Sequence, residues 1–408
     1  MPHKLPPKIR VCMAMLATNG GSSMVAKELG LGLMSNPLAN SAANTSSKQQ
    51  PQPVNFEVRY CHLQANQLQS EHYLIDAEPG AKTSALLDIP PSLGGTMDSI
   101  SELLRIHDDW PFELLHLHNL QIFGLSALLL KQLRNVPYIV TFHGSDILNP
   151  HLFDQNLEVA TQVLRHAGAI TCVSNYLADK LRQKVPDLTN IHVISNFVRA
   201  SWRDVEFVCK VQPQRFLHVS SMRAVKRPGV LLNAFSQLQK HLPNAHLAIV
   251  TTTEGARRTK KMLNDGVHSG HGLQIIDGDL NPQALTDEYA QAHAMVLTSS
   301  FEGFGLVVLE ALQHNLPVIT PAVGALPEIL GKDWPYLVIE QEGERAGVQD
   351  DEQLSTDIAQ AMNKAVQAPN ECLKSLIKQI VNRYRGPQQI AQYAALYQRI
   401  LKNQCQDY

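Results

Sequence analysis

The sequence predicts an α/β protein with two doubly wound parallel sheets, and three observations carry this expectation. Short apolar runs alternate with amphipathic helical stretches along almost the whole chain. The apolar runs are nearly continuous, which is typical of parallel strands covered by helices on both faces. Twelve such runs form two groups of six, too many for one comfortable sheet, so we expect two domains.

The first domain is expected over residues 1–200. Its predicted strands are 9–15, 56–63, 114–117, 138–141, 169–173 and 191–194, with helices over 120–133, 157–167 and 175–184. An irregular stretch between Asn196 and Gln214 follows the sixth strand, and we place the domain boundary there.

The second domain is expected over residues 201–386. Its predicted strands are 216–219, 246–250, 273–276, 294–297, 317–320 and 336–339, with helices over 228–241 and 306–314. Residues 387–408 form a last segment whose predicted helix, 387–405, needs a surface for its apolar stripe. That stripe consists of Ile390, Tyr393, Ala394, Leu396, Tyr397 and Ile400.

Composition excludes several classes of protein. The 408 residues include 35 Lys+Arg and 37 Asp+Glu, a net charge of −2, so no basic surface for nucleic acid is expected. No apolar run approaches the roughly 18 residues of a membrane span. The short run 9–17 follows Pro6 and Pro7, which favours a buried strand over a signal peptide. Six cysteines without a Cys-x-x-Cys pair favour reduced thiols and a cytoplasmic setting.

One segment departs from the alternating pattern. Residues 35–53, SNPLANSAANTSSKQQPQP, contain almost no large apolar side chain. We expect a loop there, either a plain surface insertion or a lid on the acceptor side.

The most informative segment is SSFEGFGLVVLEAL at 299–312, directly after a predicted strand. Loops at the carboxyl ends of parallel strands line the ligand crevice of such sheets. Gly303 and Gly305 permit close approach of the backbone, and a helix that begins near Leu306 offers free N–H groups to a phosphate. Glu302 and Glu310 are acceptors suited to hydroxyl groups. A nucleotide diphosphate sugar has phosphates between two polyol parts and fits this arrangement.

Other polar residues also follow predicted strands. Arg223, Lys226 and Arg227 come after the strand 216–219, where they can bind an anion. His116 and His118 have a spacing that metal ligands use, but no carboxylate or cysteine cluster completes a set of ligands. We therefore expect no metal, and we interpret His118 as a packing residue or an acceptor contact. Ser174 and Asn196 are candidates for the site or for capping and turn roles, which the sequence leaves open.

Seven blocks together resemble the retaining glycosyltransferases of family 4, also called glycosyl transferases group 1. The blocks are FEGFGLVVLEA with its Glu-x7-Glu spacing and the following PVITPAVGALPEIL, VSSMRAVKRPGVLLNAFSQL, YIVTFHGSD, ITCVSNYLADKL, NGGSS and VISNFV. NGG, TFHGSD, MRAVKR and SNF are also similar to the N-acetylglucosaminyl-malate synthases of bacillithiol biosynthesis. Residues 63–113 and 35–53 depart from that pattern.

The resemblance implies the GT-B fold, in which two Rossmann-like domains face each other across a cleft and the last helix crosses back to the first domain. It implies that Glu302 binds donor-sugar hydroxyls, that Glu310 binds the ribose, and that Arg223 and Lys226 neutralise the leaving diphosphate, with Arg227 as the alternative partner. His143 would lie close to the donor sugar. The remaining donor-binding residues would be Gly20, Gly21, Gly303, Phe304, Gly305 and Leu306.

Acceptor-side candidates are Asn19, Ser22, His118 and Asn196. The family often has an acidic residue where Ser22 and Ser23 stand, so its acceptor contacts cannot be carried over. The expected reaction moves a hexosyl group, N-acetylglucosamine or another hexose, from a UDP-sugar to an acceptor hydroxyl, with retention, front-face attack, no metal and no cofactor. The acceptor is a small hydroxy acid such as malate, or a cell-surface glycan or lipid-linked intermediate reached by peripheral membrane contact.

Three rival functions are distinguishable. A non-catalytic nucleotide-sugar sensor or scaffold could share the fold. Paired carboxylates also occur in glycosidases, and a phosphorylase could use the same groups, but Glu310 sits in a helix whose start favours phosphate. A dehydrogenase is excluded because no G-x-G-x-x-G follows the first strand. The sequence leaves open whether the protein is a monomer or a homodimer.

Overall fold

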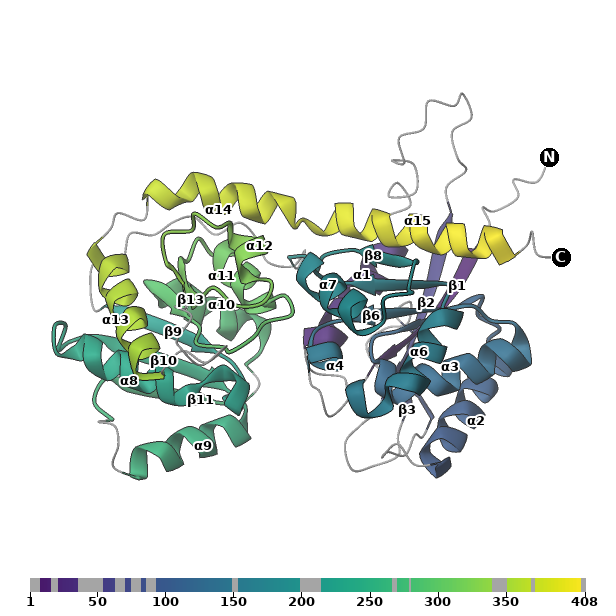
Figure 1. The fold of residues 1–408 in the computed structure, drawn as a ribbon, viewed down its shortest axis with the longest axis horizontal. Coiled ribbons are helices and arrows are strands. Elements are labelled where there is room, and N and C mark those ends of the chain that lie inside the picture. The colour runs from purple at the N-terminus through teal and green to yellow at the C-terminus, as the bar shows by residue number, and fades with distance from the viewer. Residues whose placement is uncertain are drawn as a thin grey trace. The chain divides into compact units, whose positions relative to one another are not determined.

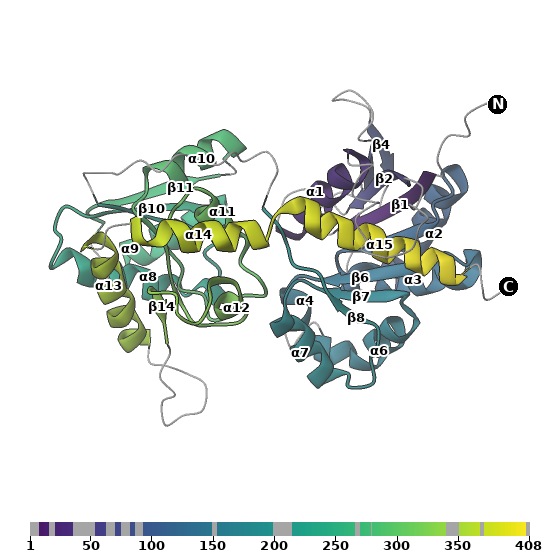
Figure 2. The ribbon, with the colours of Figure 1, turned by 90° about the horizontal axis from the view of Figure 1, so that it is seen from above.

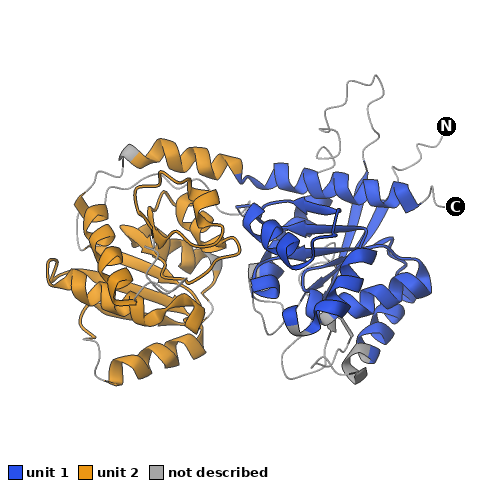
Figure 3. Cartoon of the chain, viewed as in Figure 1, with its two compact units in different colours: residues 1–200, 384–408 blue, residues 201–383 orange. Residues whose placement is uncertain are grey.

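The computed structural model contains two compact units (Figures 1 and 3). It describes residues 8–15, 21–35, 54–62, 70–74, 82–85, 93–148, 153–198, 214–265, 270–278, 280–339, 351–367 and 371–404. Unit 1 comprises Met1–Ala200 together with Tyr384–Tyr408, and unit 2 comprises Ser201–Arg383. Unit 1 is therefore built from two separate stretches of chain.

Unit 1 contains an eight-stranded sheet in the order β4-β3-β2-β1-β5-β6-β7-β8. Six of its strands run parallel and match the six predicted ones: β1 (Lys8–Met15), β2 (Asn55–His62), β5 (Leu114–Leu117), β6 (Tyr138–Phe142), β7 (Ala169–Cys172) and β8 (Ile191–Val193). β1 is central and pairs with both β2 and β5. The buried free thiols of Cys12, Cys61 and Cys172 lie on these strands.

The expectation of six strands in the first domain was wrong by two. β3 (Ser70–Leu74) and β4 (Lys82–Ala85) extend the sheet beyond β2 as antiparallel strands. Their sequences, SEHYL and KTSA, are short and largely polar, so they lack the apolar run that marks a buried parallel strand. An antiparallel extension that ends in an edge strand requires no such run.

The helices of unit 1 lie between its strands in the sequence. They are α1 (Gly21–Ser35), α2 (Leu93–Asp109), α3 (Leu120–Arg134), α4 (Ser145–Leu148), α6 (Leu157–His166) and α7 (Asn175–Lys184), with a 3₁₀ turn, η2, at Asp154–Asn156. Ser174 begins α7 by accepting a hydrogen bond from the backbone N–H of Leu177 at 3.3 Å. This assigns Ser174 the capping role.

Unit 2 contains a six-stranded parallel sheet in the order β11-β10-β9-β12-β13-β14. Its strands match the predicted ones: β9 (Arg215–Val219), β10 (His246–Thr251), β11 (Leu273–Asp277), β12 (Ala294–Val296), β13 (Val318–Pro321) and β14 (Leu337–Val338). The chain steps outward from β9 to β11 and then returns to the other side of β9 with β12.

Seven helices and one 3₁₀ turn are described in unit 2. They are η3 (Ala224–Lys226), α8 (Pro228–Gln239), α9 (Thr253–Asn264), α10 (Pro282–Gln291), α11 (Leu306–Gln313), α12 (Leu326–Leu330), α13 (Asp351–Gln367) and α14 (Glu371–Arg383). The predicted helix after Gly305 therefore begins at Leu306, as expected.

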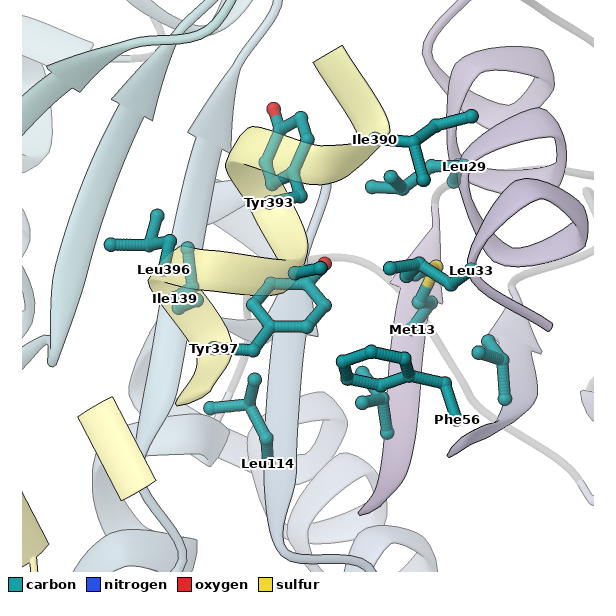
Figure 4. Packing of buried hydrophobic residues seen from close by; sticks show 14 of the residues in the cluster. Met13, Leu29, Leu33, Phe56, Leu114, Ile139, Ile390, Tyr393, Leu396 and Tyr397 are labelled. Atoms are coloured by element: carbon teal, nitrogen blue, oxygen red, sulfur yellow. The ribbon is translucent and has the colours of Figure 1, made fainter. Parts of the chain in front are cut away.

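The last helix, α15 (Gly386–Gln404), packs into unit 1 and buries all six residues of its predicted apolar stripe. It runs beside α1 (Figure 2). Ile390, Tyr393 and Tyr397 join a core cluster with Leu29 and Leu33 of α1 and residues of β1 and β2 (Figure 4). The amide of Val198 donates to the carbonyl of Tyr384 at 3.0 Å, so the two chain stretches of unit 1 also meet through their backbones.

Among the described residues, no helix combines the length and the apolar character that crossing a membrane would require.

Candidate functional site

The topology of unit 2 marks one position on its sheet. The connections that leave β9 and β12 diverge toward opposite sides, because β10 and β13 flank this central pair on either side. Ligands of open α/β sheets bind at the carboxyl ends of two such strands. The loop after β9 contains Arg223 and Lys226, and the loop after β12 contains Glu302.

Lys226 and Glu302 meet at this point as a close ion pair. Lys226 Nζ lies 2.6 Å from Glu302 Oε1, and Ser299 Oγ donates to the same carboxylate oxygen at 2.7 Å. The two side chains are only 18% and 10% exposed, so their attraction is less screened than that of a surface pair. The sequence placed both residues in the site, but it did not predict their direct contact.

Hydrogen bonds to backbone carbonyls hold the two loops together. Thr298 Oγ1 donates to the carbonyl of Lys226 at 2.7 Å, and the amide of Ser300 donates to the carbonyl of Val225 at 2.8 Å. Within the first loop, η3 closes when the amide of Lys226 donates to the carbonyl of Arg223 at 2.8 Å. The position of the Lys226 side chain is therefore set by the loop that carries Glu302.

His218 is a supporting residue that the sequence analysis missed. It lies fully buried on β9, and its Nδ1 donates to the carbonyl of Val296 on β12 at 2.8 Å. Its Nε2 lies 2.7 Å from Ser220 Oγ, which accepts the amide of Met222 at 3.1 Å. Burial lowers the pKa of His218 to about 4, so its ring is neutral and can accept from Ser220. A histidine inside an apolar strand was the available signal.

Glu310 lies on α11, whose N-cap is Gly305 in a left-handed conformation. Its buried carboxylate accepts the hydroxyl of Tyr289 at 3.0 Å. The Tyr289 ring stacks on His314 with centroids 5.0 Å apart, and His314 Nδ1 donates to the carbonyl of Glu310 at 2.8 Å. Tyr289 and His314 therefore fix Glu310 from two directions, and neither belongs to a motif that we recognised.

The other predicted residues of unit 2 are placed as follows. Gly303 and Phe304 are buried in the loop before α11. Arg223 is exposed, and its Nε donates to Ser221 Oγ at 3.1 Å rather than joining the Lys226–Glu302 pair. Arg227 adopts a left-handed conformation before α8, with its Nε 3.9 Å from Asp351 Oδ1. Of the three basic residues, Lys226 is the one that the described contacts bring to Glu302.

Unit 1 has an equivalent position between β1 and β5, where the sheet order reverses. The amide of His118, directly after β5, donates to the carbonyl of Ala14 on β1 at 2.9 Å. His143, directly after β6, lies beside it, with its Nε2 3.0 Å from His118 Nδ1. Burial lowers the pKa of His143 to about 4 and that of His118 well below its usual range, so both rings are neutral near pH 7.

Asp146 holds the turn that follows His143. Its carboxylate oxygens accept the amides of His143 at 3.2 Å and Gly144 at 2.8 Å. Burial raises the pKa of Asp146 to about 6, although these N–H groups act in the opposite direction. The TFHGSD block therefore contains its own structural support for the backbone that carries His143.

The acceptor-side candidates are less fully described. Asn19 and Gly20 lie outside the described residues. Gly21 begins α1, and Ser22 is partly buried in its first turn. Asn196 is buried after β8. Among the residues that the structure describes, no group of three or more His, Cys, Asp or Glu side chains could hold a metal ion.

Comparisons with known proteins match both units. Residues 55–202 match the model of Glycosyltransferase Family 4, and residues 213–364 match that of Glycosyl transferases group 1. The N-acetyl-alpha-D-glucosaminyl L-malate synthase of Bacillus anthracis is 23% identical over 321 residues, which is 74% of this chain and 79% of that protein. A glycogen synthase of Mycobacterium tuberculosis is 25% identical over 227 residues, about half of each chain.

Solved structures show the same fold. The sucrose-phosphate synthase of Thermosynechococcus elongatus aligns with a TM-score of 0.74 at 18% identity, over 97% of this chain and 100% of that one. Anabaena HepE in complex with UDP and glucose aligns with a TM-score of 0.64 at 14% identity, over 95% and 98%. The two family models together cover most of the chain, and it belongs to the GT-B glycosyltransferases of group 1 and family 4.

Proposed function

We propose that this glycosyltransferase moves a hexosyl group from a UDP-sugar to an acceptor hydroxyl, with retention of the anomeric configuration and without a metal ion. The observation that carries the proposal is the Lys226–Glu302 pair beside the start of α11, with Glu310 held one turn into that helix. This places a cation, a helix N-terminus and two carboxylates at the carboxyl edge of one sheet. HepE, a structural neighbour, is solved with UDP and glucose.

Each group has a distinct part in the proposed reaction. Glu310 accepts hydroxyls of the nucleotide ribose, and Glu302 accepts those of the donor sugar. An ammonium group has three N–H donors, so Lys226 can keep its contact with Glu302 and also bind a diphosphate oxygen. The pair then links recognition of the sugar to stabilisation of the leaving group.

The proposed step breaks the bond between the anomeric carbon and the diphosphate oxygen. The electron pair of that bond goes to the diphosphate, whose growing charge Lys226 and the free N–H groups of α11 stabilise. The acceptor oxygen attacks from the same face, and its proton passes to the departing diphosphate oxygen. No separate catalytic base is required for this proton.

The acceptor is proposed from similarity. The match to the Bacillus anthracis synthase makes L-malate the first acceptor to test. Polysaccharide and lipid-linked hydroxyls form the second set.

The test is a screen of nucleotide sugars for release of free nucleoside diphosphate, with and without each acceptor. We expect UDP release that depends on an acceptor and persists in EDTA. Anomeric coupling constants of the product determine retention or inversion. Tight donor binding without release in any combination would favour a sensor instead.

Variants separate the roles of the residues. Lys226→Ala should chiefly lower kcat, and Glu310→Ala should chiefly weaken donor binding, each by roughly 100-fold for a buried charged contact. Lys261→Ala, which removes an exposed lysine of α9, is the matched control. If donor affinity and rate match the control in both variants, the site assignment is wrong.

A further inference from the structure

Three histidine rings of unit 1 lie in a continuous row that ends at His143. The rings of His116 and His118 are tilted against each other with centroids 4.2 Å apart, and those of His118 and His143 are stacked at 5.3 Å. His118 Nδ1 also lies 3.0 Å from His143 Nε2, within hydrogen-bond distance. The orientation of the His143 ring is therefore tied to that of His118.

The far end of the row is anchored by both nitrogens of His116. Its Nε2 lies 2.6 Å from Thr141 Oγ1 on β6, and its Nδ1 lies 2.6 Å from the hydroxyl of Tyr397 on α15. His116 is fully buried. A ring whose two nitrogens are both bonded cannot rotate without breaking a buried hydrogen bond, which costs about 1–3 kcal/mol.

The C-terminal helix thus reaches the row of histidines directly. Tyr393, one turn before Tyr397, also packs its ring on His116 with centroids 5.5 Å apart, and its hydroxyl bonds Thr141 and Thr171. Tyr393 and Tyr397 are both fully buried beneath α15. The side of the histidine row that faces away from His143 is therefore made by residues from the end of the chain.

The contact between His118 and His143 also defines a tautomer. Both rings are neutral, so one nitrogen must donate and the other accept. His118 Nε2 is buried and has no hydrogen-bond partner in the described structure. If His118 accepted through Nδ1, its proton would sit on Nε2 as a buried N–H without an acceptor. Such groups are rarer in proteins than buried acceptors without a donor. His118 therefore donates from Nδ1, and His143 accepts at Nε2 and carries its own proton on Nδ1.

We propose that His118 and Tyr397 are positioning residues for His143. Tyr397 fixes His116, and the stacked His118 ring holds His143 Nε2. His143 is left with Nδ1–H as a hydrogen-bond donor for the substrate. This inference rests on the proposed function and on the family resemblance, which implies that His143 lies close to the donor sugar. In this arrangement His143 does not serve as a base through Nε2, because that nitrogen is already engaged.

The experiment begins with His143→Ala, which should lower kcat with saturating donor. Wild-type turnover in this variant would overturn the placement of His143 beside the donor sugar, and this inference with it. The positioning residues are then tested with His118→Leu and His118→Asn. The Asn amide can place an N–H near the position of Nδ1, whereas Leu cannot. We expect kcat to fall roughly tenfold or more in His118→Leu and to recover largely in His118→Asn, with the donor KM within about twofold in both.

Tyr397→Phe tests the contribution of α15. It removes one buried hydroxyl and keeps the ring, and we expect a roughly tenfold loss of kcat. Tyr138→Phe is the matched control, because Tyr138 is also fully buried in unit 1 but donates its hydroxyl to the carbonyl of Val163, away from the histidines. Nitrogen-15 shifts of the His143 ring provide a second readout, since loss of the Nε2 contact changes them and a general loss of stability does not.

The outcomes are decisive in each case. One result would overturn the inference and leave the proposed function intact. In that result His143→Ala is slow, whereas Tyr397→Phe and His118→Leu match Tyr138→Phe in kcat and in the nitrogen-15 shifts of the His143 ring. Equal losses in His118→Asn and His118→Leu would also overturn it. If Tyr397→Phe does not fold, the His118 pair, compared at equal Tm, decides.

Discussion

At the scale of single residues, the site consists of groups whose identities follow from the sequence and whose partners do not. Glu302, Lys226 and Glu310 stand out because charged residues in the loops after parallel strands, or in the first turns of a helix, are placed where such sheets bind ligands. The contact between Lys226 and Glu302 joins residues 76 apart in the chain, and that between Tyr289 and Glu310 joins residues 21 apart on two different helices. Tyr289 lies in an ordinary amphipathic helix, and no local pattern distinguishes it from a core tyrosine.

The hydrogen bond from Tyr289 predicts a specific defect in donor binding. In Tyr289→Phe, Glu310 loses the donor that fixes its carboxylate, so recognition of the ribose should weaken while the chemistry is unaffected. We expect the donor KM to rise at least roughly tenfold, as for one lost hydrogen bond to a charged group, with kcat within twofold. The preference for UDP over its 2′-deoxy analogue, measured by competition, should shrink. An unchanged preference would contradict this role of Tyr289.

Gly324 predicts an intolerant position in the loop that faces Glu302. Its φ is +58°, and a Cβ there would lie 2.1 Å from the backbone oxygen of Glu302. Gly331 has a φ of +88° and a ψ of 146° but open space around it, so Gly331→Ala carries only the backbone strain, about 1–3 kcal/mol. We expect Gly324→Ala to lower Tm more than Gly331→Ala and to reduce kcat. Equal Tm values of the two variants in thermal unfolding would contradict this prediction, because they would show that the loop shifts to accommodate the added methyl group.

At the scale of elements, continuous apolar runs located all twelve parallel strands to within about two residues. Parallel strands are buried on both faces, so their composition alone identifies them. β3 and β4 were missed for the opposite reason, since these short antiparallel strands at the end of the sheet carry no such apolar run. The apolar stripe of α15 shows only that some surface must cover it. The family resemblance placed this helix on the first domain, but nothing in the sequence identified α1 as its neighbour.

The packing of α15 on α1 predicts an energetic coupling between two residues. Gly32 lies against Ile390, and a Cβ at Gly32 would lie 2.2 Å from Ile390 Cδ1. Ile390→Ala should lower the free energy of unfolding by about 2–4 kcal/mol through the cavity it leaves. Gly32→Ala should be less favourable in the wild type than in the Ile390→Ala background, where its methyl group has room.

The measurement is a double-mutant cycle in urea. Gln392→Ala, on the exposed side of α15, is the control and should change the free energy of unfolding by less than about 0.5 kcal/mol. A coupling of zero between positions 32 and 390 would mean that α1 and α15 do not meet there.

At the scale of the whole molecule, the near-neutral net charge of −2 gave no sign of how many ionisable groups are buried. Histidines are buried in both units, and burial lowers the pKa values of His116, His143 and His218 to between about 3 and 4. Asp146 shifts the other way, to about 6. The sequence shows the number of histidines but not which of them lie inside.

These pKa shifts predict that stability falls on acidification. Between about pH 6.5 and pH 4 these histidines bind protons in the unfolded chain but remain neutral in the folded protein. The free energy of unfolding therefore decreases as the pH falls. Asp146 opposes this between about pH 6 and pH 4, since the folded state holds its proton there, but it is one group against several. Each net proton contributes about 1.4 kcal/mol per pH unit.

Urea unfolding between pH 7.5 and pH 5 checks this slope. His218→Asn should remove about one proton from the slope, whereas His241→Asn controls for substitution at an exposed histidine. A protein that becomes more stable from pH 6.5 to pH 5 would contradict the neutral, buried state of these rings.

The discontinuous make-up of unit 1 also has a consequence for synthesis on the ribosome. Unit 2 is one unbroken stretch and can close as soon as Arg383 has emerged, whereas unit 1 waits for Tyr384 to Gln404 although its first strand was made long before. During that interval the apolar faces of α1, β1 and β2 that α15 covers lie open to water. The first half of the protein to be translated is therefore the last to be completed, and its exposed face is where chaperones or premature aggregation act.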